Sequence, residues 1–342
     1  MKSLAGTLAA PFPWFGGKAL ACETVWAAFG QVDNYVEPFA GSAAMLLGAP
    51  DGKRVETIND ADGFVANFWR AVSKDADAVA EHADWPTNEA DLFARHSWLV
   101  RQRAELLDRL HADPEWFDVK IAGWWCWGAC NWIGSGWCAG VGPWVHDGEK
   151  IVCLPRGADN EKKGVWKQQP HLSAGQGINR QLPHLGDAGM GRRAYIMEWF
   201  GKLHERLRDV RVTCGDWSRV VKDSVTTRHG LTGVFLDPPY TKGAMDYGAG
   251  GMGQGIADDV RAWCAENGGN KLLRIVLCGH AGEHDALLPA GWTARKWTAR
   301  KGYALTEEAC ENSASETIWC SPHCMPERGV AADLFADLQE AA

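Results

Sequence analysis

The chain has 342 residues, of which 46% are apolar and 23% charged, as expected for a soluble globular protein of one large or two modest domains. No apolar run approaches the roughly 20 residues that cross a bilayer, so a membrane-spanning protein is excluded. The net charge of −8 does not indicate nucleic-acid binding, but it does not exclude it, because only the facing surface must be basic.

Eleven cysteines are scattered along the chain, an odd number that does not suit a secreted disulfide scaffold. We therefore expect reduced core thiols in a cytoplasmic protein, either bacterial or encoded by a phage and acting in its host. A zinc site would have to draw on residues of the middle region, namely Cys126, Cys130, Cys138, Cys153 and His146. Their spacing is irregular and includes no C-x-x-C pair, so no metal is predicted.

Residues 11–18, Pro-Phe-Pro-Trp-Phe-Gly-Gly-Lys, predict a loop, because prolines and paired glycines oppose regular structure. An amphipathic helix is expected from Lys18 onward, with Leu20, Val25, Trp26 and Phe29 on its inner face. The glycines let the backbone approach a ligand, and the helix N-terminus favours a negative charge such as a carboxylate. A plain loop leading into a helix is the alternative.

A strand at 34–37, a tight turn near Gly41 and a helix come next, which is typical of a nucleotide-binding α/β unit. The G-x-G-x-x-G fingerprint is absent, so NAD is disfavoured. A second strand from Arg54 to Ile58 leads into Asn59-Asp60. Asp60 lies 19 residues after Gly41, where an acid can accept hydrogen bonds from ribose hydroxyls. The apolar stripe that follows, from Phe64 to Val72, is predicted to be core.

The middle of the chain is less regular. Residues 76–113 predict charged helices, and residues 146–191 predict long loops. Between them, seven tryptophans interleave with glycines from Trp116 to Trp144. Core packing of an irregular lobe is one interpretation of this stretch, and stacking on an extruded base is the other.

A buried strand at 233–236 ends in Asp237-Pro238-Pro239-Tyr240. Neither proline can donate to a ladder, so this strand end is stiff. It presents one carboxylate, two donor-free carbonyls and one ring. Such a set suits a planar amino group on a nucleobase: Asp237 and the Pro238 carbonyl accept its hydrogens, and Tyr240 stacks on the ring.

Beyond this strand, residues 243–255 are rich in glycine, and either close over a target base or serve as a connector. A helix at 256–267 and a strand at 274–278 continue the α/β pattern, and 326–342 predicts a terminal helix or tail. A hairpin over 291–303 is expected to contact DNA phosphate. The candidate DNA-binding residues are Arg192, Arg193, Arg295, Lys296, Arg300 and Lys301.

Four ordered motifs together resemble the Dam-like (D12 class) N6-adenine-specific DNA methyltransferases. They are Trp14-Phe15-Gly16-Gly17-Lys18, Tyr35-Val36-Glu37-Pro38-Phe39-Ala40-Gly41, Asn59-Asp60 and Asp237-Pro238-Pro239-Tyr240. Cys214-Gly215-Asp216-Trp217 and the segment 316–322 add to the resemblance. Family members commonly carry a second glycine where this chain has Ala43, and we expect its methyl group to crowd the cofactor slightly.

The resemblance implies S-adenosylmethionine as cofactor and double-stranded DNA as substrate. The implied cofactor contacts are Trp14, Gly16, Gly17, Lys18, Glu37, Pro38, Phe39, Gly41, Asp60 and Asp237, and the implied catalytic residues are Asp237, Pro238, Pro239 and Tyr240. It also implies an α/β fold, with a Rossmann-like S-adenosylmethionine-dependent methyltransferase sheet and an inserted helical and loop-rich DNA-recognition region.

In this scheme the catalytic domain is discontinuous, 1–75 and 195–325, and the target-recognition region is 76–194. A monomer is our working hypothesis, and the sequence identifies no restriction partner. Three alternatives stay open: methylation of cytosine N4, methylation of RNA, and an inactive DNA-binding protein of the same fold.

Overall fold

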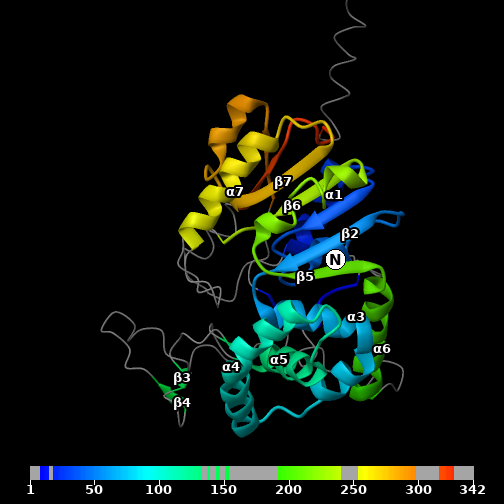
Figure 1. The fold of residues 1–342 in the computed structure, drawn as a ribbon, viewed down its shortest axis with the longest axis vertical. Helices are drawn as coiled ribbons and strands as arrows, with labels where there is room; N and C mark the ends of the chain where they lie inside the picture. The colour runs from blue at the N-terminus through cyan, green and yellow to red at the C-terminus, as the bar shows by residue number, and fades with distance from the viewer. Residues whose placement is uncertain are drawn as a thin grey trace, which may run out of the picture.

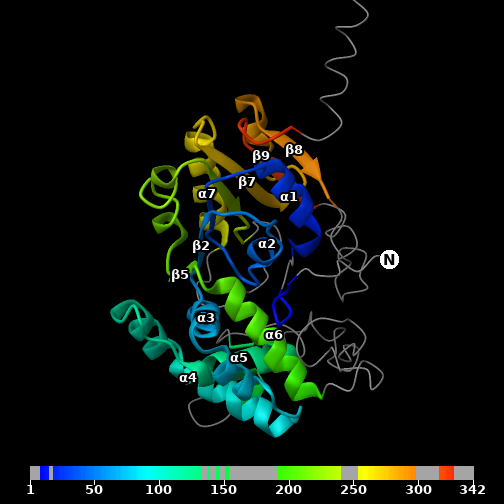
Figure 2. The same cartoon turned by 90° about the vertical axis from the view of Figure 1, so that its right-hand side faces the viewer.

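The computed structural model describes residues 8–14, 18–132, 137–138, 144–146, 151–153, 191–239, 253–297 and 316–326. Its centre is a mixed sheet of seven strands in the order β5-β2-β1-β6-β7-β9-β8. Helices cover both faces of this sheet, and further helices gather beyond its β5 edge (Figures 1 and 2). The strands are β1 (Asn34–Glu37), β2 (Val55–Asp60), β5 (Val210–Cys214), β6 (Thr232–Leu236), β7 (Leu273–His280), β8 (Thr293–Lys296) and β9 (Glu316–Cys320).

Strand direction fixes which residues meet at one edge of the sheet. The strands β5, β2, β1, β6 and β7 run parallel to one another, and β9 runs antiparallel between β7 and β8. The chain builds outward from β1 through β2 to β5, then returns to β6 on the other side of β1. The β1–β6 boundary is therefore a topological switch point, where the carboxyl ends of an open α/β sheet form a crevice.

Two clusters of buried side chains make the core, one on each face of the sheet. α7 (Gly253–Asn267) covers one face, and α1 (Cys22–Phe29) and α2 (Ala44–Leu47) lie on the other (Figure 2). Short 3₁₀ helices join these layers, at Lys18–Ala21, Trp217–Arg219, Thr227–His229 and Asp285–Ala290. Fully buried β1 and β6 are expected for strands covered on both sides.

The helices beyond β5 are α3 (Gly63–Ala83), α4 (Glu89–Ala112), α5 (Val119–Asn131) and α6 (Arg192–Leu207). Side-chain caps begin three of them: Asp62 accepts from the Phe64 N–H, Asn88 from Asp91 and Asp118 from Ile121. α3 is kinked at Asp75, whose backbone is not helical. A small two-stranded sheet, β3 (Trp144–His146) and β4 (Ile151–Cys153), completes the described elements.

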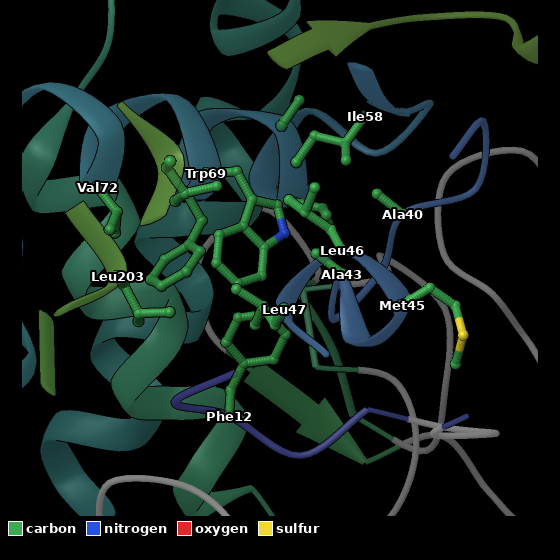
Figure 3. Close-up of a cluster of buried hydrophobic side chains, with 14 of the residues drawn as sticks. Phe12, Ala40, Ala43, Met45, Leu46, Leu47, Ile58, Trp69, Val72 and Leu203 are labelled. Carbon is green, nitrogen blue, oxygen red and sulfur yellow. The ribbon is translucent and has the colours of Figure 1, made fainter. Parts of the chain in front are cut away.

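The helical region and the sheet share one core. Phe12, before the first helix, lies against Phe68 of α3 and Trp125 of α5, with ring centroids 5.1 and 4.8 Å apart. Figure 3 shows Phe12 below Trp69, with Leu46, Leu47 and Ala43 beside that indole. α6 joins through Phe200, which contacts Phe68. The buried cluster thus runs continuously from α2 to α5.

The predicted strand at 34–37 is confirmed at both ends, and the other predicted strands are confirmed with bounds that differ by one or two residues. The predicted apolar stripe from Phe64 to Val72 is buried. Leu20 is an exception to the prediction for the first helix, because its side chain is 45% exposed while Val25, Trp26 and Phe29 are buried. Leu20 lies in the 3₁₀ turn before α1, so the helical period starts after it.

Two other predictions concern the C-terminal half. The strand expected at the start of the 291–303 hairpin is β8, but its antiparallel neighbour is β9, and residues 298–303 lie outside the described residues. Most of the loops at 146–191 and 243–255, and all of the tail after residue 326, also lie outside them. Within the described part of the chain, no helix is both long enough and apolar enough to cross a membrane.

Candidate active site

Three acidic residues stand at the carboxyl ends of neighbouring strands. Glu37 ends β1, Asp60 ends β2, and Asp237 directly follows β6. Because these strands are parallel and adjacent, the three residues lie at one edge of the sheet, beside the switch point. Their surroundings give them different roles.

Asp237 is held by a buried lysine. The Nζ of Lys18, at the start of the first 3₁₀ helix, lies 3.3 Å from Asp237 Oδ1 and 3.4 Å from Glu316 Oε2. Burial by itself lowers the pKa of an ammonium, but the two carboxylates outweigh it and the pKa of Lys18 is raised. Lys18 therefore stays charged and orients Asp237, whose side chain is 21% exposed at the strand end.

The turn after β1 brings backbone close to Asp60. Gly41 has φ +46°, in the left-handed region that glycine adopts easily, and its N–H donates to Asp60 Oδ2 at 2.9 Å. A Cβ on Gly41 would lie 2.2 Å from the Trp14 ring, so only glycine allows this indole to cover the turn. On the opposite side, Trp69 Nε1 donates to the Gly41 carbonyl at 2.9 Å.

Asp60 has a strongly shifted acidity. Burial raises its pKa to about 7, although hydrogen bonds from the Asp62 and Gly41 N–H groups oppose the shift. The side chain is half-buried, so the carboxylate is not sealed from a ligand. An acid that titrates near neutral pH at a strand end is a candidate binding group.

Glu37 is an internal acid. It is 2% exposed, and its Oε2 accepts from the Tyr35 hydroxyl at 3.0 Å and from the Leu46 N–H at 3.2 Å. Burial raises its pKa to about 8. The predicted role of Glu37 as a direct cofactor contact is not supported by this placement, because its carboxylate fastens α2 to β1.

The model of the D12 class N6 adenine-specific DNA methyltransferase family matches residues 14–108. The predicted family is confirmed over this range. It is a family of enzymes. The match contains Trp14, Lys18, Gly41 and Asp60. None of the curated proteins matches the chain.

The other site residues that the sequence predicted lie partly inside and partly outside the matched range, and the structure places them in different surroundings. Asp237 joins the Lys18 cluster, Pro238 is buried and Pro239 half-buried. Gly16, Gly17 and Tyr240 lie outside the described residues. Pro38 is buried and its carbonyl accepts from Asn59 Nδ2 at 3.0 Å. Phe39 is half-buried and stacks on Trp217, with centroids 6.1 Å apart.

Three residues at these strand ends were not assigned roles from sequence. Asn59 is buried and also donates to the Gly215 carbonyl at 2.9 Å, so its amide joins the ends of β1, β2 and β5. Trp217 supplies the ring facing Phe39, and Glu316 the second carboxylate on Lys18. All three lie in segments that carried the resemblance, but nothing local indicated their partners.

The predicted DNA-binding residues are mostly engaged elsewhere or outside the described residues. Arg193 is exposed and pairs with Glu81 at 2.7 Å. The prediction of a phosphate contact for Arg295 needs correction. Its side chain is 8% exposed, and its Nη2 donates to the Met325 carbonyl at 2.6 Å. This bond joins β8 to the segment after β9 and does not support a phosphate contact. Lys296 is exposed. The side chains of Arg192, Arg300 and Lys301 are not described.

The described tryptophan side chains of the stretch 116–144 pack in or against the core, with Trp116, Trp124 and Trp137 only half-buried. Trp125, Trp127 and Trp132 are buried, which favours core packing over base stacking for these three. Cys126 and Cys130 are buried thiols whose Sγ atoms both face the Pro11 carbonyl. The nine cysteines whose side chains are described are free, and no cluster of three metal-binding side chains occurs among the described residues.

Proposed function

We propose that this chain transfers a methyl group from S-adenosylmethionine to the N6 amino group of adenine in double-stranded DNA. The family match supports adenine methylation in DNA. The observation that carries the finer proposal is the ion pair between Lys18 and Asp237, because it positions a carboxylate at the switch point of the sheet.

The residues around this carboxylate fit the cofactor. Asp60 offers acceptor oxygens for ribose hydroxyls, the left-handed turn at Gly41 allows a close approach of the backbone, and Phe39 and Trp14 offer aromatic surface. When bound, S-adenosylmethionine supplies an electrophilic methyl group on a sulfonium whose neutral thioether leaves readily. The seven-stranded sheet then corresponds to a Rossmann-like methyltransferase sheet, and residues 76–194 to the target-recognition region.

The remaining difficulty is the nucleophile. The lone pair of an exocyclic amine is delocalised into the base, so it attacks poorly unless the nitrogen becomes tetrahedral. Asp237 and the Pro238 carbonyl accept the two amino hydrogens and favour that geometry, and Tyr240 stacks on the base. Lys18 keeps the Asp237 carboxylate in one orientation, so the reaction relies on positioning and electrostatics. The proton leaves after transfer, and Asp237 need not be a strong base.

The N6 amine is inaccessible inside a duplex, so the target adenine must be extruded from the stack. The stiff Asp-Pro-Pro strand end gives the extruded base a fixed surface. The same acceptors would also serve the N4 amine of cytosine. The product therefore has to be identified by its mass.

The decisive experiment uses labelled S-adenosylmethionine and mixed-sequence duplex DNA, with nucleoside digestion and mass spectrometry. We expect N6-methyladenine from the wild type, and at least a 100-fold lower rate from Asp237→Asn, as for loss of a positioned polar group. Asp209→Ala, an exposed acid in the turn after α6, is the control and should be unaffected. Near-normal transfer by the Asp237 variant would refute the site. N4-methylcytosine would keep the site and change the base.

A further inference from the structure

A cavity of about 570 Å³ lies on the helical region, apart from the strand ends. The end of α3, the first half of α4 and the middle of α5 line it. Its aromatic walls are Trp85, Trp98 and Trp124, and its basic groups are Arg95 and Arg101. Trp85 is 46% exposed, whereas most tryptophans of the described region are buried or half-buried.

Arg95 forms the floor of this cavity, and it is unusual. Its side chain is 7% exposed, and its guanidinium lies over three indoles, 4.3 Å from Trp127, 4.8 Å from Trp124 and 5.2 Å from Trp85. Its Nη1 is buried and finds no hydrogen-bond partner among the residues that the structure describes. A buried donor left unsatisfied costs free energy, so a small side-chain movement that brings this N–H to an acceptor of a ligand would be favourable.

The carboxylates at the cavity are already bonded. Glu81 pairs with Arg193 at 2.7 Å, and Asp91 accepts from Trp85 Nε1 and from Asn88 Nδ2, both at 2.5 Å. Lys120 Nζ lies over the Trp98 and Trp124 rings, at 4.6 and 4.5 Å. The exposed indole of Trp85 and the exposed guanidinium of Arg101 are therefore the groups that the cavity offers most openly to a ligand. Indoles stack on planar rings and guanidinium groups bind phosphate, so the chemistry favours a nucleotide over a peptide.

α5 connects the cavity to the residues near the strand ends. Trp125, next to Trp124 on α5, turns the other way and contacts Phe12 and Trp14, with centroids 4.8 and 6.3 Å apart. Trp14 in turn covers the Gly41 turn. The cavity is therefore connected through one helix, α5, to the segment around Trp14.

We propose that this cavity binds one nucleotide of the substrate DNA away from the target adenine, with its base on the indoles and its phosphate at the guanidinium groups. The proposal rests on the proposed function, because it takes DNA as the substrate. It makes Trp85 and Arg101 binding residues that determine how the duplex is held.

The test is the affinity of the full chain for a fluorescein-labelled mixed-sequence duplex, measured by anisotropy over a range of salt concentrations. Trp85→Ala should raise Kd about tenfold and leave the salt dependence unchanged, as for loss of one stacking surface. Arg101→Ala should raise Kd and reduce the slope of log Kd against log salt by about 1, as for loss of one phosphate contact.

Two controls are matched to these variants. Leu272 is 47% exposed, like Trp85, and Leu272→Ala should bind DNA as the wild type does. Arg109 lies on α4 like Arg101 and stacks on Trp116 at 5.5 Å outside the cavity, so Arg109→Ala should also be neutral. Circular dichroism and the thermal midpoint check that each variant is folded.

The outcomes separate this proposal from the function it rests on. Weaker binding by both cavity variants, with neutral controls, supports it. Wild-type affinity in the cavity variants overturns it, while methyl transfer by the wild-type chain leaves the proposed function intact. A wild-type chain that neither binds nor methylates DNA overturns both. Photo-crosslinking with iodouracil-substituted DNA gives a second readout, because cross-links that avoid Trp85 and Trp98 also overturn it.

Discussion

At the residue scale, two left-handed residues in the turn after β1 are not equivalent. Gly41 has φ +46°, and Ala43, which ends the turn before α2, has φ +49°. For an L-residue this conformation costs roughly 1–2 kcal/mol. The sequence led us to expect that the Ala43 methyl group would crowd the cofactor. The structure instead places that methyl in the core, fully buried beside Leu46 (Figure 3). The energetic cost at Ala43 therefore comes from its left-handed backbone.

This difference predicts that substitutions at the two positions change the free energy of unfolding by different amounts. Ala43→Gly relieves about 1–2 kcal/mol of backbone strain but loses a buried methyl worth about 0.8 kcal/mol and adds unfolded-state entropy of about 0.4–1 kcal/mol. The free energy of unfolding should therefore change by less than about 1 kcal/mol. Gly41→Ala combines the same strain with a collision against Trp14, and should destabilise by about 3 kcal/mol or more.

Urea denaturation measures both changes. The control is Gly201→Ala, because Gly201 lies within α6 and an added Cβ there meets nothing within 4 Å. That substitution should stabilise by about 0.5–1 kcal/mol, as expected for an open helical position. A Gly41→Ala variant as stable as the wild type would show that the Trp14 contact with the turn is not required.

Asp60 predicts a pH dependence of cofactor binding. Burial raises its pKa to about 7, so below that pH the carboxylate is protonated and accepts ribose hydroxyls poorly. The Kd for S-adenosylmethionine should rise as pH falls from 8 to 6, by up to about tenfold per unit below the pKa. The effect on folding has its own sign. Because the pKa of Asp60 is raised in the folded protein, protonation of Asp60 favours folding. This contribution to the free energy of unfolding is full below the ordinary aspartate pKa of about 3.9 and is lost as pH rises to about 7.

Isothermal titration calorimetry at several pH values tests this. Asp60→Asn should bind more weakly at pH 8 and should lose the pH dependence, because an amide does not titrate. Glu37→Gln is the comparison, since Glu37 is a neighbouring acid with a raised pKa that is enclosed by Tyr35 and Leu46. If Asp60→Asn kept the wild-type pH profile, another group would be responsible.

At the element scale, the strand ends could be predicted from sequence, and their partners could not. The strand at 233–236 is a short apolar run, and both it and the strand at 34–37 are cut off by an acid followed by proline, so local sequence determines where they end. Parallel pairing then places Glu37, Asp60 and Asp237 at one edge. The pairing of Lys18 with Glu316 depends on β9 inserting antiparallel between β7 and β8, and no local pattern specifies that insertion.

The partners of the basic residues could not be predicted from local sequence either. A run such as Arg295-Lys296 reads as a cationic surface, but alternation along β8 turns Arg295 inward to the Met325 carbonyl and leaves Lys296 exposed. Arg193 is likewise opposed by Glu81, which comes from α3. No local sequence pattern predicts the cavity lined by Arg95, because its tryptophans come from three separate segments.

At the scale of the whole molecule, the helical region does not stand apart from the sheet. α3 begins directly after β2 and packs against α5, and Gly123 of α5 lies so close that an added Cβ would be 2.6 Å from the Val79 carbonyl. Phe12 then joins both helices to the segment that leads to Lys18. We expect a helical region built this way to move with the strand ends as one unit.

This architecture predicts that sheet and helical region unfold together. Cys278 on β7 and Cys126 on α5 are both free and fully buried, so their labelling by a thiol reagent in rising urea reports on each region separately. The two midpoints should coincide.

Phe12→Ala should lower both midpoints by the same amount, corresponding to about 3–5 kcal/mol for a buried aromatic, because the ring belongs to a core that both regions share. Leu272→Ala, at an exposed site, should leave both midpoints unchanged. Labelling of Cys126 at lower urea than Cys278, in the wild type or only in the Phe12 variant, would mean that the helical region folds as an independent domain.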